Sequence, residues 1–280
     1  MKQQLLASLS MLALSLVPLA RASVIVDESF ENYFTGAVTD NTVAGNATGI
    51  STANIRIGGI TSNSATITTG GLTYSSGTLS VDGGDQRLNM SGTDAGSTSF
   101  GLTLATSRAP STGSFYFSFM HRFNGALAGG DYGYTTFQPT ASGYPSTINM
   151  ATGSLSSLFR SAVGGTVSSS PSAFTANTVN FVVVEYLSDG ANWTGANIWV
   201  NPSSAVQGAA TYSISGATYN GTLVALAPLI NGLDDGDSVD FDRMQLATTW
   251  AEAIPEPCTW LLITGAGIFF VIRRRFLRTA

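Results

Sequence analysis

The sequence predicts an all-β fold, a sandwich or jelly roll in which two sheets pack face to face. Short apolar or alternating runs recur along the middle of the chain, and residues that favour turns, above all glycine, serine, threonine and asparagine, separate them. No window in this stretch shows a sustained helical stripe. Many short strands in one chain can each bury a face only if two sheets cover one another.

Residues 1–22 have the three parts of a secretory signal peptide. Lys2 provides the positive start, an apolar run follows over residues 5–20, and Ala20 and Ala22 are small residues at the spacing that signal peptidase requires. We expect cleavage after Ala22. The alternative is an uncleaved membrane anchor, which is disfavoured because the run is shorter than the roughly 20 residues of a spanning helix.

The segment 23–253 is expected to form one β-sandwich ectodomain, because its length suits one large domain and its texture is uniform. The only cysteine is Cys258, so a large core rather than a disulfide must hold this domain together. Eleven stretches are predicted to be strands: 23–30, 55–60, 64–69, 97–104, 113–123, 131–138, 177–187, 195–202, 211–216, 219–230 and 238–247.

Alternation within residues 113–123 shows which side chains the core would take. Four phenylalanines, at positions 115, 117, 119 and 123, share one face of this strand, and the only histidine, His121, falls on the same face. A histidine there is expected to be a hydrogen-bonded residue at the rim rather than a catalyst.

The charge of the chain disfavours a nucleic-acid partner or a peripheral-membrane role. Between Asp27 and Glu256 there are six arginines, no lysine and all seventeen acidic residues, which gives a formal net charge of −11. Such a surface repels phosphate backbones and anionic lipids.

No catalytic motif is present, so we expect the protein not to be an enzyme. Glu185 and Asp189 on one strand would lie roughly 13 Å apart, too far for either glycosidase geometry. The chain has one histidine and no G-x-S-x-G elbow, which leaves a serine hydrolase unsupported. The alternative is a carbohydrate-active hydrolase with an unrecognised site.

Residues 231–242 are rich in aspartate and could hold calcium. Asp234, Asp235 and Asp237 supply oxygen ligands, although the spacing is not that of an EF-hand. If Phe241 faces the core, Asp240 and Asp242 point to solvent. The alternative is a solvated turn that leads into an edge strand.

Two tryptophans beside amide side chains could contact a sugar. Trp193 and Trp199 lie near Asn192 and Asn201, and Trp199 takes the strand face opposite to its two aliphatic neighbours. The alternative is that both rings belong to the core, as tryptophans in sandwiches mostly do.

Three stretches resemble a group of bacterial extracellular proteins with a concanavalin A-like (laminin-G-like) sandwich. They are "VDESFENYFTGAV" at 26–38, "VNFVVVEYLSDGANWTGANIWVNP" at 179–202 and "VDFDRMQLATTWAEAIPEP" at 239–257. The resemblance covers about a fifth of the chain, matches nothing between residues 41 and 110, and implies a concanavalin A-like jelly roll. Such sandwiches include lectins, glucanases and adhesive modules, so it implies no single activity.

The last segment, residues 254–280, closely resembles the PEP-CTERM sorting signal of exopolysaccharide-producing Gram-negative bacteria. The motif Pro255, Glu256, Pro257 is followed by an uncharged run over 259–272 and an arginine-rich tail over 273–280. The run is short for a transmembrane helix, and Arg273, Arg274, Arg275 and Arg278 form the positive stop signal. The resemblance implies transient anchoring in the inner membrane, processing by exosortase, and transfer to the cell surface or extracellular matrix.

One residue departs from that signal. Cys258 stands where serine or another small residue commonly follows the motif, and it could also be oxidised or acylated. Together these observations predict a surface-sorted structural or adhesive protein with polysaccharide as its expected partner. A domain without any ligand is a further alternative.

Overall fold

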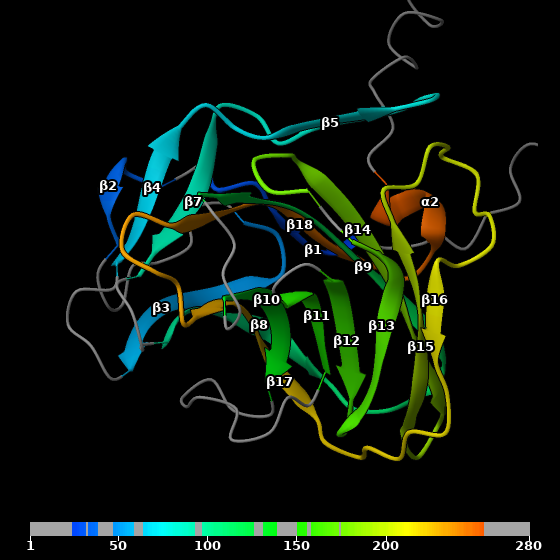
Figure 1. Ribbon diagram of the computed structural model, residues 1–280. Coiled ribbons are helices and arrows are strands. Elements are labelled where there is room, and N and C mark those ends of the chain that lie inside the picture. The colour runs from blue at the N-terminus through cyan, green and yellow to red at the C-terminus, as the bar shows by residue number, and fades with distance from the viewer. Residues whose placement is uncertain are drawn as a thin grey trace, which may run out of the picture.

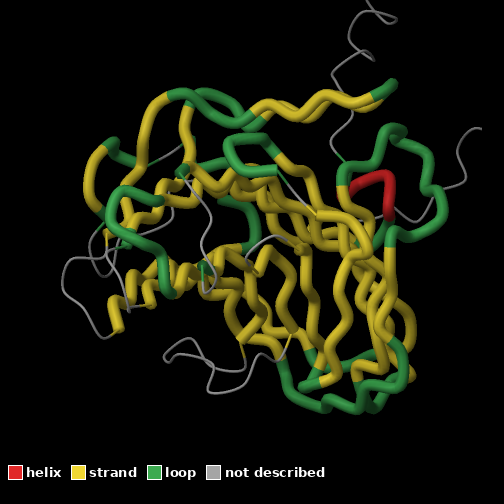
Figure 2. Tube along the Cα trace, in the orientation of Figure 1, coloured by secondary structure: helices red, strands yellow, loops and turns green. Residues whose placement is uncertain are grey.

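The computed structural model describes residues 24–31, 33–38, 47–58, 64–92, 97–125, 131–138, 150–155, 158–173 and 175–254. These residues form two antiparallel sheets that pack face to face (Figures 1 and 2). The all-β class is therefore confirmed, and each of the eleven predicted stretches contains a strand.

The larger sheet has nine strands and carries the features discussed below. In spatial order its strands are β16 (Tyr212–Ile214), β15 (Trp193–Val200), β14 (Asn180–Asp189), β9 (Thr112–Asn124), β18 (Ser238–Ala247), β7 (Gln86–Ser91), β4 (Ser64–Thr69) and β2 (Gly36–Ala37), with β1 (Val24–Glu28) also paired to β18.

The second sheet has seven strands. In spatial order they are β13 (Thr166–Ala173), β12 (Leu158–Val163), β11 (Met150–Leu155), β10 (Tyr132–Gln138), β17 (Leu223–Asn231), β8 (Ser97–Arg108) and β3 (Ile50–Gly58). A separate hairpin, β5 (Thr73–Ser76) and β6 (Leu79–Asp82), and a short helix, α2 (Trp250–Ala253), complete the described elements.

The main core lies between the two sheets, and β9 contributes to it as the alternation predicts. Its four phenylalanines are buried there. His121 lies on the same face but in the core itself rather than at the rim, with its ring 5.5 Å from that of Phe119 and 6.5 Å from that of Phe241. Burial lowers the pKa of His121 to about 3, so the imidazole is neutral at physiological pH.

A second hydrophobic cluster covers part of the outer face of the nine-stranded sheet, the face turned away from the second sheet. The β5–β6 hairpin passes over this face (Figure 1), and α2 packs on it against β9 and β18, with the ring of Trp250 on that of Trp199 from β15. Side chains from the sheet, the hairpin and α2 meet there with little exposure. They include Met120, Phe181, Val183 and Trp199 from the sheet, Leu72, Tyr74, Leu79 and Val81 from the hairpin segment, and Trp250, Ala253 and Ile254 from the helical end.

The predicted signal peptide at 1–22, with Ala20 and Ala22, lies outside the described residues. So do the motif at 255–257, Cys258, the uncharged run at 259–272 and the arginines of 273–280. Within the part of the chain that is described, no helix has the length and apolar character needed to cross a membrane.

Candidate functional site: an acidic cluster where the sheets meet

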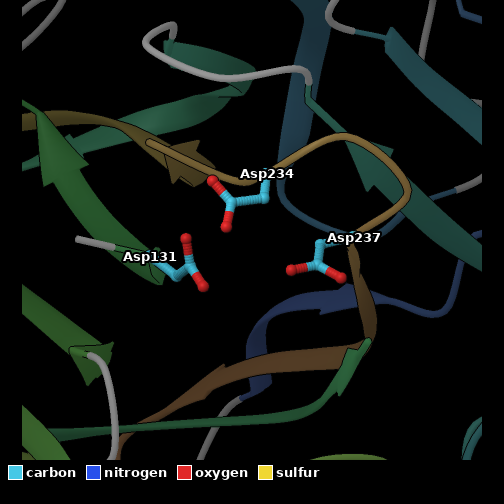
Figure 3. Close-up of side chains that lie close together, drawn as sticks. All are labelled: Asp131, Asp234 and Asp237. Carbon is cyan, nitrogen blue, oxygen red and sulfur yellow. The ribbon is translucent and has the colours of Figure 1, made fainter. Parts of the chain in front are cut away.

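Three carboxylates converge where the start of β10 meets the loop between β17 and β18. One oxygen from each of Asp131, Asp234 and Asp237 lies within 4.8 Å of the others, and the three side chains point toward one another (Figure 3). Asp131 is 1% exposed, Asp237 is half-buried and Asp234 is exposed. The cluster is therefore partly open to solvent, at Asp234.

The strand register brings these residues together. Asp131 immediately precedes β10, and the pairing of β10 with β17 places Tyr132 opposite Asn231. The chain then turns back, because the Asp237 N–H donates to the carbonyl of Asp234 at 3.0 Å. Gly236 has φ +95° at the third position of this turn, a conformation that glycine adopts without strain.

The backbone of Gly125 lies directly against the carboxylate of Asp237. Gly125 follows the end of β9, has φ +115°, and a Cβ at this position would overlap Asp237 Oδ1. Only a residue without a side chain allows the backbone to approach the carboxylate so closely.

The geometry of the cluster fits a calcium ion. Calcium binds oxygen ligands at 2.3–2.6 Å, so two ligands on one ion lie at most about 5 Å apart, which agrees with the separation of these oxygens. Carboxylates held this close repel one another, and a divalent cation removes that repulsion. The residues present therefore fit calcium as a resident ion, with Asp131, Asp234 and Asp237 as its protein ligands.

The predicted calcium site overlaps this cluster in part. Two of the three predicted calcium ligands, Asp234 and Asp237, belong to it, whereas Asp235 is exposed and lies outside the group. Asp131 was not predicted, although it begins the predicted strand at 131–138. Its proximity depends on the pairing of β10 with β17, which no local pattern in the sequence specifies.

Of the two alternatives for Trp193 and Trp199, the structure has both rings packed in hydrophobic clusters, so neither is presented for contact with a sugar. They are 1% and 5% exposed, and their indole N–H groups donate to the carbonyls of Gly221 and Gly208 at 3.1 and 2.9 Å. Trp199 does face away from the main core, as its strand position predicts. The second hydrophobic cluster covers it there, with the ring of Trp250 at 4.8 Å.

The two asparagines have local structural roles. Asn201 has φ +53°, its side-chain oxygen accepts from the Phe181 N–H at 2.9 Å, and its amide donates to Asn180. Asn192 is half-buried, and its backbone N–H donates to Asp189 Oδ1 at 2.7 Å in the turn between β14 and β15. These residues and the two buried tryptophans therefore do not form a shared surface for a ligand.

The prediction of a solvated edge strand after the acidic loop is also wrong. The strand β18 pairs with both β9 and β7, and Asp240 and Asp242 are each 0% exposed although Phe241 faces the main core as expected. Asp242 accepts from the backbone N–H groups of Leu72 and Arg243, both at 2.7 Å. Burial is the main cause that raises the pKa of Asp242 to about 8.

No protein-family model matches the sequence, and no curated protein does. Among solved structures, an endo-β-1,4-glucuronan lyase from the fungus Trichoderma reesei is 15% identical, with 80% of this chain and 99% of that chain covered and a TM-score of 0.49. The globular domain of T. cruzi calreticulin is 10% identical, with 81% and 89% covered and a TM-score of 0.45.

A third structure is the exoplasmic/lumenal domain of VIP36 in a Ca²⁺/Man3GlcNAc-bound form. It is 12% identical, with 62% of this chain and 89% of that chain covered and a TM-score of 0.42. Similarities at this level assign neither a family nor an activity to the chain.

Proposed function

We propose that this chain is an exported, non-catalytic polysaccharide-binding protein with a concanavalin A-like jelly roll that calcium stabilises. The convergence of Asp131, Asp234 and Asp237 carries the calcium part of this proposal, and the sequence resemblances carry the polysaccharide part. Asp131 is almost fully buried, and a buried carboxylate beside two others is stabilised by a cation. The ion would hold the β17–β18 loop against the start of β10 and so fix the shape of this end of the sandwich.

Two observations support a binding role rather than catalysis. His121 is enclosed by aromatic rings in the core, where it cannot reach a substrate. Glu185 and Asp189 have separate partners, because Glu185 accepts from Tyr116 and Asn197 while Asp189 accepts from backbone N–H groups of its own turn.

Export and sorting rest on the sequence. The signal peptide at 1–22, the motif at 255–257, the run at 259–272 and the arginine tail support transient anchoring in the inner membrane of a Gram-negative bacterium. Exosortase would then process the chain and pass it to the cell surface or the extracellular matrix. Mass spectrometry of the native surface protein is expected to find a carboxyl terminus near Pro257 or Cys258, and intact Ala280 in that material would contradict sorting.

Calcium binding is tested by calorimetric titration of the full-length protein in a nonionic detergent. We expect binding of one calcium ion and a higher Tm in calcium than in EDTA. Asp131→Asn is expected to weaken calcium binding at least about 10-fold, because it removes the buried ligand charge. Asp235→Asn, in the same turn but outside the cluster, is the matched control and is expected to change affinity by less than about 3-fold. Equal affinities of the two variants would refute the site.

The hydrolase alternative has one specific observation in its favour, the convergence of three carboxylates within 4.8 Å. Glycosidases also use paired carboxylates, at separations of about 5 Å or more. We expect no release of reducing ends when the protein is incubated with polysaccharides. Release that Asp131→Asn abolishes would assign the cluster to catalysis instead.

A further inference from the structure

A second polar site lies on the outer face of the nine-stranded sheet. Its side chains come from β7, β9 and β18 and do not belong to the second hydrophobic cluster. Its centre is Asp240 on β18, which faces away from the main core because Val239 and Phe241 face into it. The register places Asp240 opposite Asn89 on β7 and opposite Arg122 on β9. We call the following six residues the outer polar patch: Arg87, Asn89, Arg122, Asn124, Ser238 and Asp240.

The patch is a single hydrogen-bonded network around the buried carboxylate. Asp240 Oδ1 accepts from Asn89 at 2.7 Å and contacts Arg87 Nε at 3.0 Å. Asp240 Oδ2 accepts from Arg122 Nη2 at 2.6 Å and from Asn124 at 2.9 Å. The side chains of two arginines are thereby fixed by an anion that is itself 0% exposed.

The protonation state of Asp240 follows from these contacts. Burial alone would raise its pKa, but the hydrogen bonds from Asn89, Asn124 and Arg122 and the charge of Arg87 outweigh burial and hold the pKa below its ordinary value. Asp240 therefore stays ionised and keeps the arginines in place.

Both arginines retain donors that the network does not use. Arg122 donates to Asp240 through Nε and Nη2. Arg87 forms an ion pair with Asp240 through Nε and donates from Nη1 to the carbonyls of Thr69 and Gly70. Among the described residues, none accepts from Arg122 Nη1 or Arg87 Nη2. The two side chains are 30% and 20% exposed, so these donors can be reached from solvent.

The patch carries a local positive charge on an acidic protein. Two guanidinium groups and one carboxylate leave a charge of +1, whereas the chain between Asp27 and Glu256 carries −11. At physiological salt the Debye length is about 8 Å, so the more distant acidic residues are largely screened. Within the patch itself, an anion would therefore meet two guanidinium groups and one carboxylate.

We propose that the outer polar patch binds the acidic groups of a polysaccharide, a carboxylate or a sulfate, through the unused donors of Arg122 and Arg87. Planar guanidinium groups match such oxyanions with parallel hydrogen bonds. The amide N–H groups of Asn89 and Asn124 already donate to Asp240 and Ser238, so their amide oxygens and the Ser238 O–H are what the patch offers to neighbouring sugar hydroxyls. This inference rests on the proposed function and specifies its ligand class. Calcium held by Asp237, the residue before Ser238, would further reduce the negative charge at the border of the patch.

The test measures binding of the full-length protein, in nonionic detergent and calcium, to three polymers. Polygalacturonate presents carboxylates, dextran sulfate presents sulfates, and unmodified dextran presents neither. We expect binding to one or both acidic polymers and not to dextran, and the preferred polymer identifies the group. Arg122→Gln and Arg87→Gln are each expected to weaken this binding about 10-fold or more.

Two further variants make the test specific. Arg243→Gln removes the same charge from an arginine of similar exposure that pairs with Asp27 at 3.5 Å, outside the patch, and is expected to change affinity less than about 2-fold. Arg122→Lys keeps a positive charge beside Asp240 but loses the planar fork, and a loss of about 3- to 10-fold is expected. It also provides a result if circular dichroism shows that Arg122→Gln does not fold.

The outcomes separate this inference from the proposed function. Equal losses in the Arg122, Arg87 and Arg243 variants, wild-type affinity in Arg122→Lys, or equal binding to dextran would overturn the patch as the site and leave polysaccharide binding standing. Silence on all three polymers would also overturn the patch. If the protein also bound nothing on a glycan array of neutral polysaccharides, the proposal of polysaccharide binding itself would fail. The calcium titration would still test the acidic cluster independently.

Discussion

Replacement of Asp242 by asparagine should change how the stability of the domain depends on pH. In the folded state this carboxyl group is 0% exposed beneath the base of the β5–β6 hairpin, and the backbones of Gly71 and Gly83 lie so close that a Cβ on either would contact it. Burial raises its pKa from 3.8 to about 8. The nearby charge of Glu31 acts in the same direction.

The sign of the effect follows from proton binding. Between pH 4 and 8 the folded protein holds the proton on Asp242 and the unfolded chain does not, so the stabilisation is complete below pH 3.8 and is lost as the pH rises through 8. Glu28 acts in the same sense, because burial raises its pKa from 4.5 to about 7. Two groups act in the opposite sense. The lowered pKa of Asp240 makes its contribution fall only on acidification below pH 3.8. Burial lowers the pKa of His121 from 6.5 to about 3, so its contribution is complete above pH 6.5, falls on acidification below it, and is common to wild type and Asp242→Asn.

The magnitude can be estimated from the shift of Asp242. Between pH 5 and the folded-state pKa of about 8, about three pH units at about 1.4 kcal/mol each set a ceiling of about 4 kcal/mol, and relaxation around the ionised group reduces the effect to about 2–3 kcal/mol. For a domain of this size that corresponds to a fall in Tm of about 4–12 °C between pH 5 and pH 9.

The assay is thermal unfolding of the full-length protein in EDTA, followed by circular dichroism at pH 5, 6, 7, 8 and 9. Wild type is expected to lose Tm over this range, and Asp242→Asn, which is neutral throughout, should lose clearly less. Asp235→Asn removes an exposed carboxylate and should keep the wild-type slope. A wild-type Tm that rises with pH, or an Asp242→Asn slope equal to that of wild type, would refute the reasoning.

Two further predictions concern the second hydrophobic cluster and the acidic cluster. Trp250→Ala removes a ring that packs on Trp199 and an indole N–H that donates to Ala205 at 2.7 Å, so urea titration should show a loss of about 3–5 kcal/mol in the free energy of unfolding. Phe34→Ala, at a position 98% exposed, should change it by less than about 0.5 kcal/mol, and equal losses would contradict the packing argument. Gly125→Ala should destabilise the protein by about 1–3 kcal/mol, because φ at this position is +115°. It should also weaken calcium binding, because the new Cβ would displace Asp237. Unchanged calcium affinity would contradict the close contact between Gly125 and Asp237.

The sequence predicted the fold class because strand alternation is a local property. The phenylalanines of β9 and the outward position of Trp199 follow from the two-residue period alone. The burial of Trp199 could not be predicted, because the hairpin that covers it lies at residues 73–82, in the stretch between 41 and 110 that resembled nothing known. A strand's face can be predicted from its own residues, but what packs on that face depends on segments far away in the chain.

In the candidate sites, too, residues close together in the sequence could be predicted and residues joined by strand pairing could not. Asp234 and Asp237 could be predicted because they lie three residues apart in one turn. Asp131 could not, because it joins them through the register of β10 against β17, and the arginines around Asp240 come from two neighbouring strands more than a hundred residues away along the chain. Predictions of solvent exposure failed at Asp240 and Asp242 because β18 proved to be a central strand, with neighbours on both sides.

The position of α2 limits where the chain could be cut. Ala253 and Ile254 are 0% and 1% exposed and belong to the hydrophobic layer under the hairpin, so the packing of the described domain extends to at least Ile254. A protease that cut even two residues upstream of the motif would remove side chains from that layer. Under the proposed sorting, the Pro-Glu-Pro motif therefore marks the earliest point at which the tail can be removed without loss of packing in the domain that it delivers.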